Sequence, residues 1–292
     1  MNNRLMFFLF LFISGIIFAQ KNFLLNSLIK NEYAFSERAG EVGTRQSFLD
    51  FIADDGILFR PTPVNGKQYL TENNKPSSGV LSWYPSRAIV SRDGDLGFTS
   101  GPWEWKRDKD DSAAAAFGNF CTVWQRQSNG AWKFVIDFGN SNDKPISKES
   151  PLKYEDENAN AVHGLIKGLR RTKPDELILL DKKFSEMASK IGAANTYEKF
   201  TNAVSEILRN ESYPIVGKSS ISGYINSEKK HYSFKPAGGK ISSSKDLGFT
   251  YGELTVSNDA DNSSGDYHYM RVWEKEKNRW IIVTEVLDKI KK

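Results

Sequence analysis

Apolar residues at helical spacing open each half of the chain. In the first half this stripe covers residues 24–35 and ends before Gly43, and a second short helix is expected around Phe48. In the second half the stripe covers residues 177–187, and the pattern predicts a further helix over 196–208. Both halves are therefore expected to begin with two helices.

Runs rich in β-forming residues follow the helices, separated by clusters of Gly, Asn, Asp and Pro. They cover 57–59, 88–90, 96–105, 117–125 and 132–138 in the first half, and 213–216, 224, 232–234, 247–256, 267–273 and 280–287 in the second. Helices first and strands after predict an α+β fold. We expect the helices of each half to pack on one face of an antiparallel sheet.

The two halves also share residues at matching positions. The matches are Phe-Ser-Glu at 35–37 and 184–186, Asp-Leu-Gly-Phe-Thr at 95–99 and 246–250, Trp124 with Trp273, and Trp132 with Trp280. A spacing of about 150 residues is too long for a solenoid unit and suits one domain. The chain is therefore interpreted as a duplicated domain, with a first copy over 20–140, a linker over 141–173 and a second, more divergent copy over 174–292.

The first residues have the pattern of an export signal. Arg4 precedes an apolar run over 5–12, and the small residue Ala19 follows. This run is nearer in length to the apolar region of a signal peptide than to a membrane-spanning helix. We expect residues 1–19 to be a signal peptide and the mature chain to be exported, either periplasmic or secreted. An uncleaved N-terminal anchor is the alternative.

Composition excludes several classes of function. A formal net charge of +4 is too small to indicate nucleic-acid binding. No stretch after Lys21 approaches membrane-spanning length, so stable membrane insertion after cleavage is not expected. Cys121 is the single cysteine, and the three histidines, His163, His231 and His268, all lie outside the first copy. No metal motif occurs, and we expect neither a metal nor another cofactor.

Several motifs of the first copy resemble one known superfamily. The motifs are Trp83-Tyr84-Pro85, the run Asp-Leu-Gly-Phe-Thr-Ser-Gly-Pro-Trp over 95–103, Val123-Trp124, and Gly-Ala-Trp-Lys over 130–133. Together with the order of elements, they resemble the nuclear-transport-factor-2-like superfamily, and within it the SnoaL-like branch and its exported relatives of unknown function. The likeness covers most of residues 25–139. The second copy keeps residues 246–252 but has Leu254 roughly where Trp103 falls.

The resemblance implies two tandem cone-shaped domains, each with helices against a strongly curved antiparallel sheet and a pocket between them. Members of the superfamily include isomerases, dehydratases, cyclases, epoxide hydrolases and many proteins with no known reaction. The resemblance therefore implies a cavity without specifying a chemistry. Many members dimerise through their sheets, so the two copies are expected to pack as an internal pseudo-dimer.

In enzymes of this superfamily a pocket carboxylate often moves a proton, and Asp137 is the best match by position. It lies five residues after Trp132, as Glu285 lies five after Trp280. Strand alternation places Trp132, Phe134 and Ile136 on one face and Asp137 on the other, away from the core, unless the strand is bulged. A structural, salt-bridged Asp is the alternative.

Aromatic residues are the other candidates. Trp83, Tyr84, Trp103, Trp105 and Trp124 could line an apolar pocket, although core packing is the alternative for Trp124. The sequence thus favours an exported, non-catalytic protein that binds a small apolar or amphipathic molecule in the first copy. One alternative is a cofactor-free isomerase, dehydratase or hydrolase that uses Asp137 with Tyr84. The other is a structural or protein-interaction module.

Overall fold

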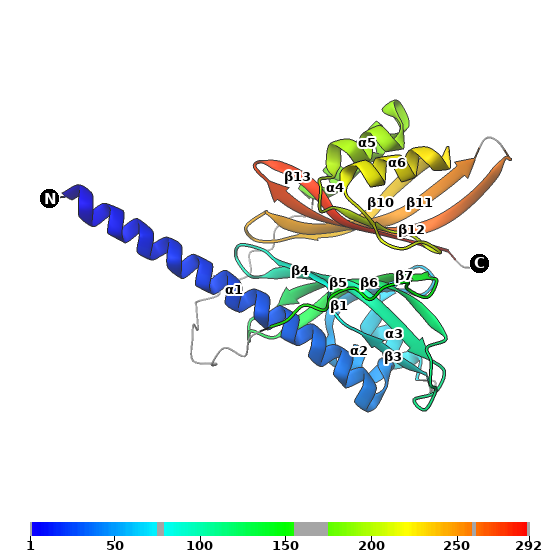
Figure 1. The fold of residues 1–292 in the computed structure, drawn as a ribbon, viewed down its shortest axis with the longest axis horizontal. Coiled ribbons are helices and arrows are strands. Elements are labelled where there is room, and N and C mark those ends of the chain that lie inside the picture. Colours follow the sequence, from blue (N-terminus) through cyan, green and yellow to red (C-terminus); the bar gives the residue numbers. More distant parts are fainter. Residues whose placement is uncertain (1, 75–78, 155–174, 259–260, 291–292) are drawn as a thin grey trace.

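The computed structural model describes residues 2–74, 79–154, 175–258 and 261–290, and side chains from Asn22 onward within these ranges. Two α+β repeats follow each other along the chain, each with a separate curved sheet (Figure 1). The helices of each repeat lie on the outer face of its sheet, and the inner faces of the two sheets meet. Among the described residues no helix is long and apolar enough to cross a bilayer.

The first repeat contains three helices and seven strands within the described residues. They are α1 (Asn2–Val42), α2 (Thr44–Phe51), β1 (Ile52–Phe59), β2 (Pro63–Asn65), α3 (Gly66–Glu72), β3 (Val80–Trp83), β4 (Arg87–Val90), β5 (Leu96–Lys106), β6 (Ala116–Arg126) and β7 (Trp132–Asn142). The sheet has the order β2-β1-β7-β6-β5-β3, with β4 also paired to β5. Only the β1–β7 pair is parallel, so the sheet is mixed rather than wholly antiparallel.

The second repeat contains three helices and six strands within the described residues. They are α4 (Asp175–Ile191), α5 (Ala193–Phe200), β8 (Glu206–Leu208), β9 (Ile215–Val216), α6 (Lys218–Glu228), β10 (His231–Ile241), β11 (Leu247–Asn258), β12 (Ser263–Glu276) and β13 (Arg279–Lys289). Its sheet has the order β10-β11-β12-β13-β8-β9, in which β8 is parallel to β13. Gly43 and Gly192 separate the first two helices of the two repeats with φ angles of 86° and 85°, a region that favours glycine.

The prediction of one helix over 196–208 is wrong. Helix α5 ends at Phe200, and the side chain of Asn202 then accepts hydrogen bonds from the backbone N–H groups of Val204 and Ser205. This Asn turn breaks the helix. Ile207 and Leu208 consequently bury their side chains from strand β8, where pairing with β13 satisfies the backbone. Tyr224, expected in a strand, lies in α6.

A β-bulge changes which side chains of β7 face the helices. Trp124 pairs with Phe134 and Val123 pairs with Ile136, so Val135 is an extra residue. The alternation therefore slips by one residue, and Asp137 returns to the helix side together with Trp132 and Phe134. The prediction that Ile136 shares that face is wrong, because Val135 and Ile136 both join the opposite cluster. Strand β13 carries the equivalent bulge at Val283.

A third apolar core lies between the two sheets, beside the core of each repeat. The first repeat contributes Phe98, Val123, Val135, Ile136 and Phe138, among others, and the second contributes Phe249, Met270, Val272, Val283 and Val286. Burying such side chains is worth about 1.5–3 kcal/mol each relative to exposing them. The two repeats are therefore held together by a buried apolar core that both sheets share.

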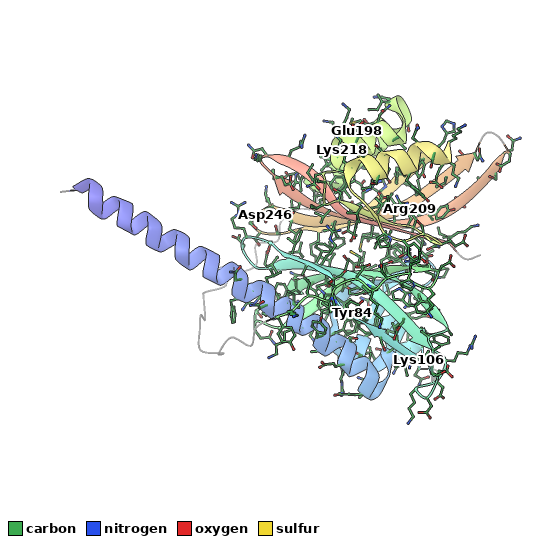
Figure 2. All side chains as sticks on the ribbon, viewed as in Figure 1. Tyr84, Lys106, Glu198, Arg209, Lys218 and Asp246 are labelled. Atoms are coloured by element: carbon green, nitrogen blue, oxygen red, sulfur yellow. The ribbon has the colours of Figure 1, made fainter. Side chains whose placement is uncertain are left out.

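Two polar contacts flank this core with approximate two-fold symmetry. Asp95 accepts a hydrogen bond from the backbone N–H of Ser243 at 2.9 Å, and Asp246 accepts one from the backbone N–H of Arg92 at 3.0 Å. Figure 2 labels Asp246 near the boundary between the two repeats. Arg92 and Ser243 occupy matching places in the two repeats. Each Asp therefore satisfies a turn of the opposite repeat, as residues do across the isologous interface of a symmetric dimer.

Candidate ligand pocket in the first repeat

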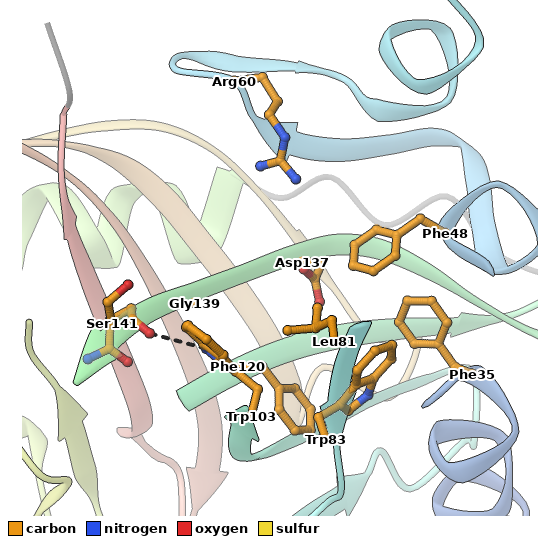
Figure 3. A pocket seen from close by; sticks show the side chains of 11 residues that line it. Phe35, Phe48, Arg60, Leu81, Trp83, Trp103, Phe120, Asp137, Gly139 and Ser141 are labelled. Atoms are coloured by element: carbon orange, nitrogen blue, oxygen red, sulfur yellow. Dashed lines mark hydrogen bonds between the residues drawn. The ribbon is translucent and has the colours of Figure 1, made fainter. Parts of the chain in front are cut away.

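A cavity of about 240 Å³ lies inside the first repeat, between the helices and the sheet (Figure 3). Its wall is largely aromatic. The lining residues are Phe35, Phe48, Arg60, Leu81, Trp83, Trp103, Phe120, Asp137, Gly139, Asn140 and Ser141. Helices α1 and α2 supply Phe35 and Phe48, and strands β3, β5, β6 and β7 supply most of the rest. Such a cavity, apolar with few polar groups, has the character of a small-molecule site.

Asp137 is the acidic group in the lining of this cavity. Its carboxylate accepts a hydrogen bond from Thr122 Oγ1 at 2.6 Å, across the β6–β7 pair. Burial raises the pKa of Asp137 to about 6, against the opposing effects of the Thr122 hydrogen bond and the charge of Arg60. Arg60 extends toward the same cavity from the end of β1. The bulge in β7 thus brings Asp137 into the pocket that the superfamily resemblance implies.

A second acid, Glu32, lies behind the pocket wall and is fully buried. It accepts hydrogen bonds from Trp83 Nε1 at 2.6 Å, Thr99 Oγ1 at 2.5 Å and Trp124 Nε1 at 3.0 Å. Burial raises the pKa of Glu32 to about 7, the three donors oppose this, and the charge of Asp137 adds to it. Sequence reasoning missed Glu32. The sequence did contain a signal, because both repeats have an acid at this position. Glu32 lies three residues before Phe35, and Asp181 lies three residues before the matching Phe184.

The structure distributes the predicted aromatic residues over four places. Trp83 and Trp103 line the pocket, and the Nε1 of Trp103 donates to the backbone oxygen of Asn140. Trp124 is fully buried behind the wall, where it binds Glu32. Tyr84 lines a separate, outer cavity, and Trp105 packs over Gly79 outside the lining of both. Asp137 and Tyr84 are therefore not brought together.

Comparisons with known proteins give fold matches alone. No family model matches the sequence, and no curated protein matches it. Among solved structures, a ketosteroid isomerase-like protein from Erwinia carotovora matches at 14% identity and a TM-score of 0.36, over 41% of this chain and 99% of its own. Nuclear-transport-factor-2-like proteins from Shewanella oneidensis and Cytophaga hutchinsonii match at 15% and 14% identity, each with a TM-score of 0.34. They cover 39% and 40% of this chain, and 98% and 99% of their own.

Each repeat has an α+β fold in which helices pack against a curved sheet, as the sequence predicts. The fold alone does not specify a chemistry, so the functional argument depends on the pocket.

In the second repeat an arginine occupies the position of the first repeat's Thr122. Arg271 pairs with Glu285 across β12 and β13, as Thr122 pairs with Asp137 across β6 and β7. Arg271 Nε lies 2.5 Å from Glu285 Oε2, and another of its nitrogens contacts Asp181. All three side chains are fully buried. The guanidinium therefore bridges the two acids whose counterparts in the first repeat are Asp137 and Glu32.

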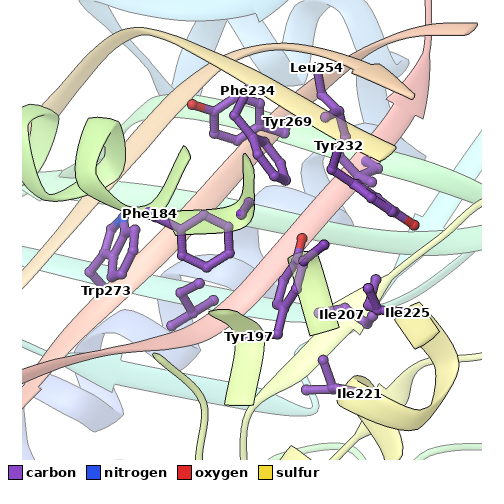
Figure 4. Close-up of a cluster of buried hydrophobic side chains, with 14 of the residues drawn as sticks. Phe184, Tyr197, Ile207, Ile221, Ile225, Tyr232, Phe234, Leu254, Tyr269 and Trp273 are labelled. Atoms are coloured by element: carbon purple, nitrogen blue, oxygen red, sulfur yellow. The ribbon is translucent and has the colours of Figure 1, made fainter. Parts of the chain in front are cut away.

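Aromatic side chains surround this buried arginine. Figure 4 shows three of them, Phe184, Phe234 and Tyr269, among the buried side chains of the second repeat. The guanidinium carbon lies 3.9 Å from the ring centre of Phe184 and 4.0 Å from that of Phe234, distances that suit cation–π stacking. Tyr197 donates to Glu285 at 2.6 Å, and Arg209 Nη2 lies 2.5 Å from the same carboxylate. An ion-pair network of Asp181, Arg209, Arg271 and Glu285 therefore lies in the interior of the second repeat.

The network also gives Glu285 of β13 a pKa shift opposite in direction to that of its counterpart Asp137. Burial raises the pKa of Glu285, but the charges of Arg271 and Arg209 outweigh burial and hold that pKa below its usual value. Burial outweighs the charge of Arg60 at Asp137, so the pKa of Asp137 is raised. Within the described residues no group of three His, Cys, Asp or Glu side chains is arranged to hold a metal ion.

Proposed function

We propose that the first repeat binds a small apolar or amphipathic molecule in its cone, with Asp137 as the polar anchor. The observation that carries this proposal is the difference between Thr122 of the first repeat and Arg271, which occupies the same position in the second repeat. Thr122 leaves space beside Asp137, whereas Arg271 fills the corresponding space beside Glu285. In the second repeat, the ion pairs of Arg271 with Asp181 and Glu285 occupy the matching part of the interior. A cavity in the first repeat supports ligand binding over a purely structural role.

The lining limits the class of ligand. Phe35, Phe48, Trp83 and Phe120 provide flat apolar walls, and Asp137 provides one hydrogen-bond acceptor. A cavity of about 240 Å³ suits a compact molecule with one donor group, such as a hydroxyl or an amine, at its polar end. Arg60 can contact a second polar group at the rim. We further propose that the protein works after export, as the N-terminal residues predict.

The experiment is mass spectrometry of small molecules that co-purify with the mature protein from its native compartment. The matched variant is Thr122→Arg, which copies the arrangement of Arg271 in the first repeat. We expect the wild type to carry a ligand and T122R to lose it, with the same circular dichroism spectrum for both. Trp105→Phe, an aromatic change outside the pocket, is expected to retain it.

Three results would count against ligand binding in this cone. The first is a ligand-free wild-type protein that shows no thermal shift across a metabolite library. The second is a folded T122R variant that carries the ligand as well as the wild type does. The third is loss of the ligand from W105F.

A second candidate function is proton transfer by Asp137. A carboxyl group with a pKa of about 6 in an apolar pocket is suited to act as a general base near neutral pH. Asp137→Asn separates the two proposals once a ligand is known. An enzyme would lose exchange of a ligand proton with solvent deuterium while still binding the ligand, and a binding protein would show no Asp137-dependent exchange.

A further inference from the structure

A second cavity, of about 620 Å³, lies outside the cone of the first repeat. Trp83 and Trp103 line both cavities, but the outer one is enclosed by different segments. Its other walls come from the segment after β7 and from Tyr213 and Pro214 of the second repeat.

Residues 143–149, named here the strap, form the outer wall of this cavity. At one end, the hydroxyl of Tyr213 donates to the backbone oxygen of Lys144 at 2.9 Å. At the other end, Glu149 accepts hydrogen bonds from Ser86 Oγ at 2.5 Å and, through its backbone oxygen, from Tyr84 at 3.0 Å. The strap is thus held at Lys144 by the second repeat and at Glu149 by the first repeat. Pro145 to Lys148 cross the space between these two anchors.

The lining of the outer cavity is apolar at its centre. Tyr84, Trp103, Phe117 and Tyr213 contribute aromatic surface, with Pro102, Pro145 and Pro214 between them. The polar groups deep in the wall already bind one another, since Asn119 Nδ2 donates to Glu149 Oε1 at 3.3 Å. They therefore have little hydrogen-bonding capacity left for a ligand, so its body is expected to be apolar.

The lining contains two cationic and two anionic side chains. Lys144 and Lys148 are the cations, and Glu104 and Glu149 are the anions. This balance gives no preference for a charged ligand of either sign. At the mouth, the side chain of Ile146 is 89% exposed and Tyr213 is 40% exposed. An apolar residue so exposed on a fixed strap is expected to contact a ligand that enters the cavity.

We propose that this outer cavity is a second binding site, for a neutral molecule with a flat apolar body and a polar end that remains at the rim. The body stacks on Trp103 and Tyr213, and Ile146 covers it from the strap. A volume of about 620 Å³ is within the usual range of small-molecule sites and exceeds that of the inner pocket. The site requires both repeats, because Tyr213 supplies both a wall and the anchor of the strap.

The test is a fluorescence titration with phenylnaphthylamine, a neutral fluorophore with a flat apolar body. Tyr213→Ala removes the ring from the wall, and Tyr213→Phe keeps the ring but loses the hydrogen bond to Lys144. We expect Y213A to weaken probe binding about tenfold and Y213F to change it by less than about threefold. Thr122→Arg, which closes the inner pocket, is expected to leave binding at the outer site unchanged.

A separate variant covers the case in which Y213A fails to fold. Ile146→Asp changes an exposed side chain on the strap and is expected to weaken probe binding to a similar degree. The proposal is overturned if T122R abolishes probe binding while Y213A and I146D leave it intact, because the probe would then occupy the inner pocket alone. Absence of saturable binding to the wild type would overturn it equally.

Discussion

At the scale of single residues, two buried acids with raised pKa values couple folding of the first repeat to pH. The pKa of Asp137 is raised to about 6 and that of Glu32 to about 7. Between the usual carboxyl pKa and these values, the folded protein binds more protons than the unfolded chain. Its stability from these groups is therefore present at low pH and is lost as pH rises through about 6 to 7.

Asp137→Asn is expected to remove the part of this pH dependence that Asp137 causes. At pH 8 the variant should be more stable than the wild type by about 1–3 kcal/mol, because a neutral amide replaces a buried carboxylate. The difference should disappear toward pH 4, where Asp137 is protonated. Urea unfolding followed by tryptophan fluorescence between pH 4 and 8 measures it. A wild type that equals or exceeds D137N in stability at pH 8 would contradict this prediction.

Glu32 and Arg271 show which residues sequence reasoning could not assign. The internal repeat aligns Glu32 with Asp181 and Thr122 with Arg271, but a sequence does not show which of these side chains meet. The bridging role of Arg271 becomes visible only when α4, β12 and β13 bring Asp181 and Glu285 to either side of it. Pocket residues with flat, apolar character, such as Trp83 and Trp103, were predictable because they flank loops in the better-matched repeat.

At the scale of elements, periodicity predicts the opening helices and the long strands, but it does not predict a β-bulge of a single residue. The apolar stripe of residues 24–35 and the strands that carry Trp124 and Trp132 follow directly from spacing. The bulge at Val135 does not, because one extra residue leaves composition and length almost unchanged while it reverses the faces beyond it. That reversal decides whether Asp137 faces the cone.

Periodicity also fails over residues 196–208, where it predicts one continuous helix. Apolar residues at Phe200, Val204 and Ile207 fit helical spacing, yet the Asn202 turn ends α5 and begins a strand. A turn built from side-chain hydrogen bonds competes locally with a helix, and burial against β13 decides the outcome. Short strands such as β3 and β8 were missed because three or four residues carry too little pattern.

At the scale of the whole molecule, the two repeats pack sheet against sheet around a shared apolar core. The Asp95 and Asp246 contacts repeat each other across this interface. Such an arrangement gives the first repeat one covered face and leaves its cone on the opposite side of the sheet (Figure 1). The second repeat contacts the first through this interface and through Tyr213, while its own interior contains the ion pairs of Arg271.

Small-angle X-ray scattering of the mature chain tests this pairing in solution. We predict the profile of one particle with the two sheets in contact, because opening the interface would expose the apolar core between them. A profile of two beads on a mobile linker would contradict it.

The bulge in β7 turns Asp137 into the cone of the first repeat, and a carboxyl titration by NMR tests this placement most directly. Isotope-labelled aspartate is followed from pH 3 to 8, with Asp137→Asn to assign the signal. We predict a midpoint near 6 for Asp137 in the wild type. In T122R the midpoint should fall below that of a free aspartate, because the new guanidinium would pair with Asp137 as Arg271 pairs with Glu285. A wild-type midpoint near 4, the value of a solvated aspartate, would contradict the burial of Asp137 in the cone.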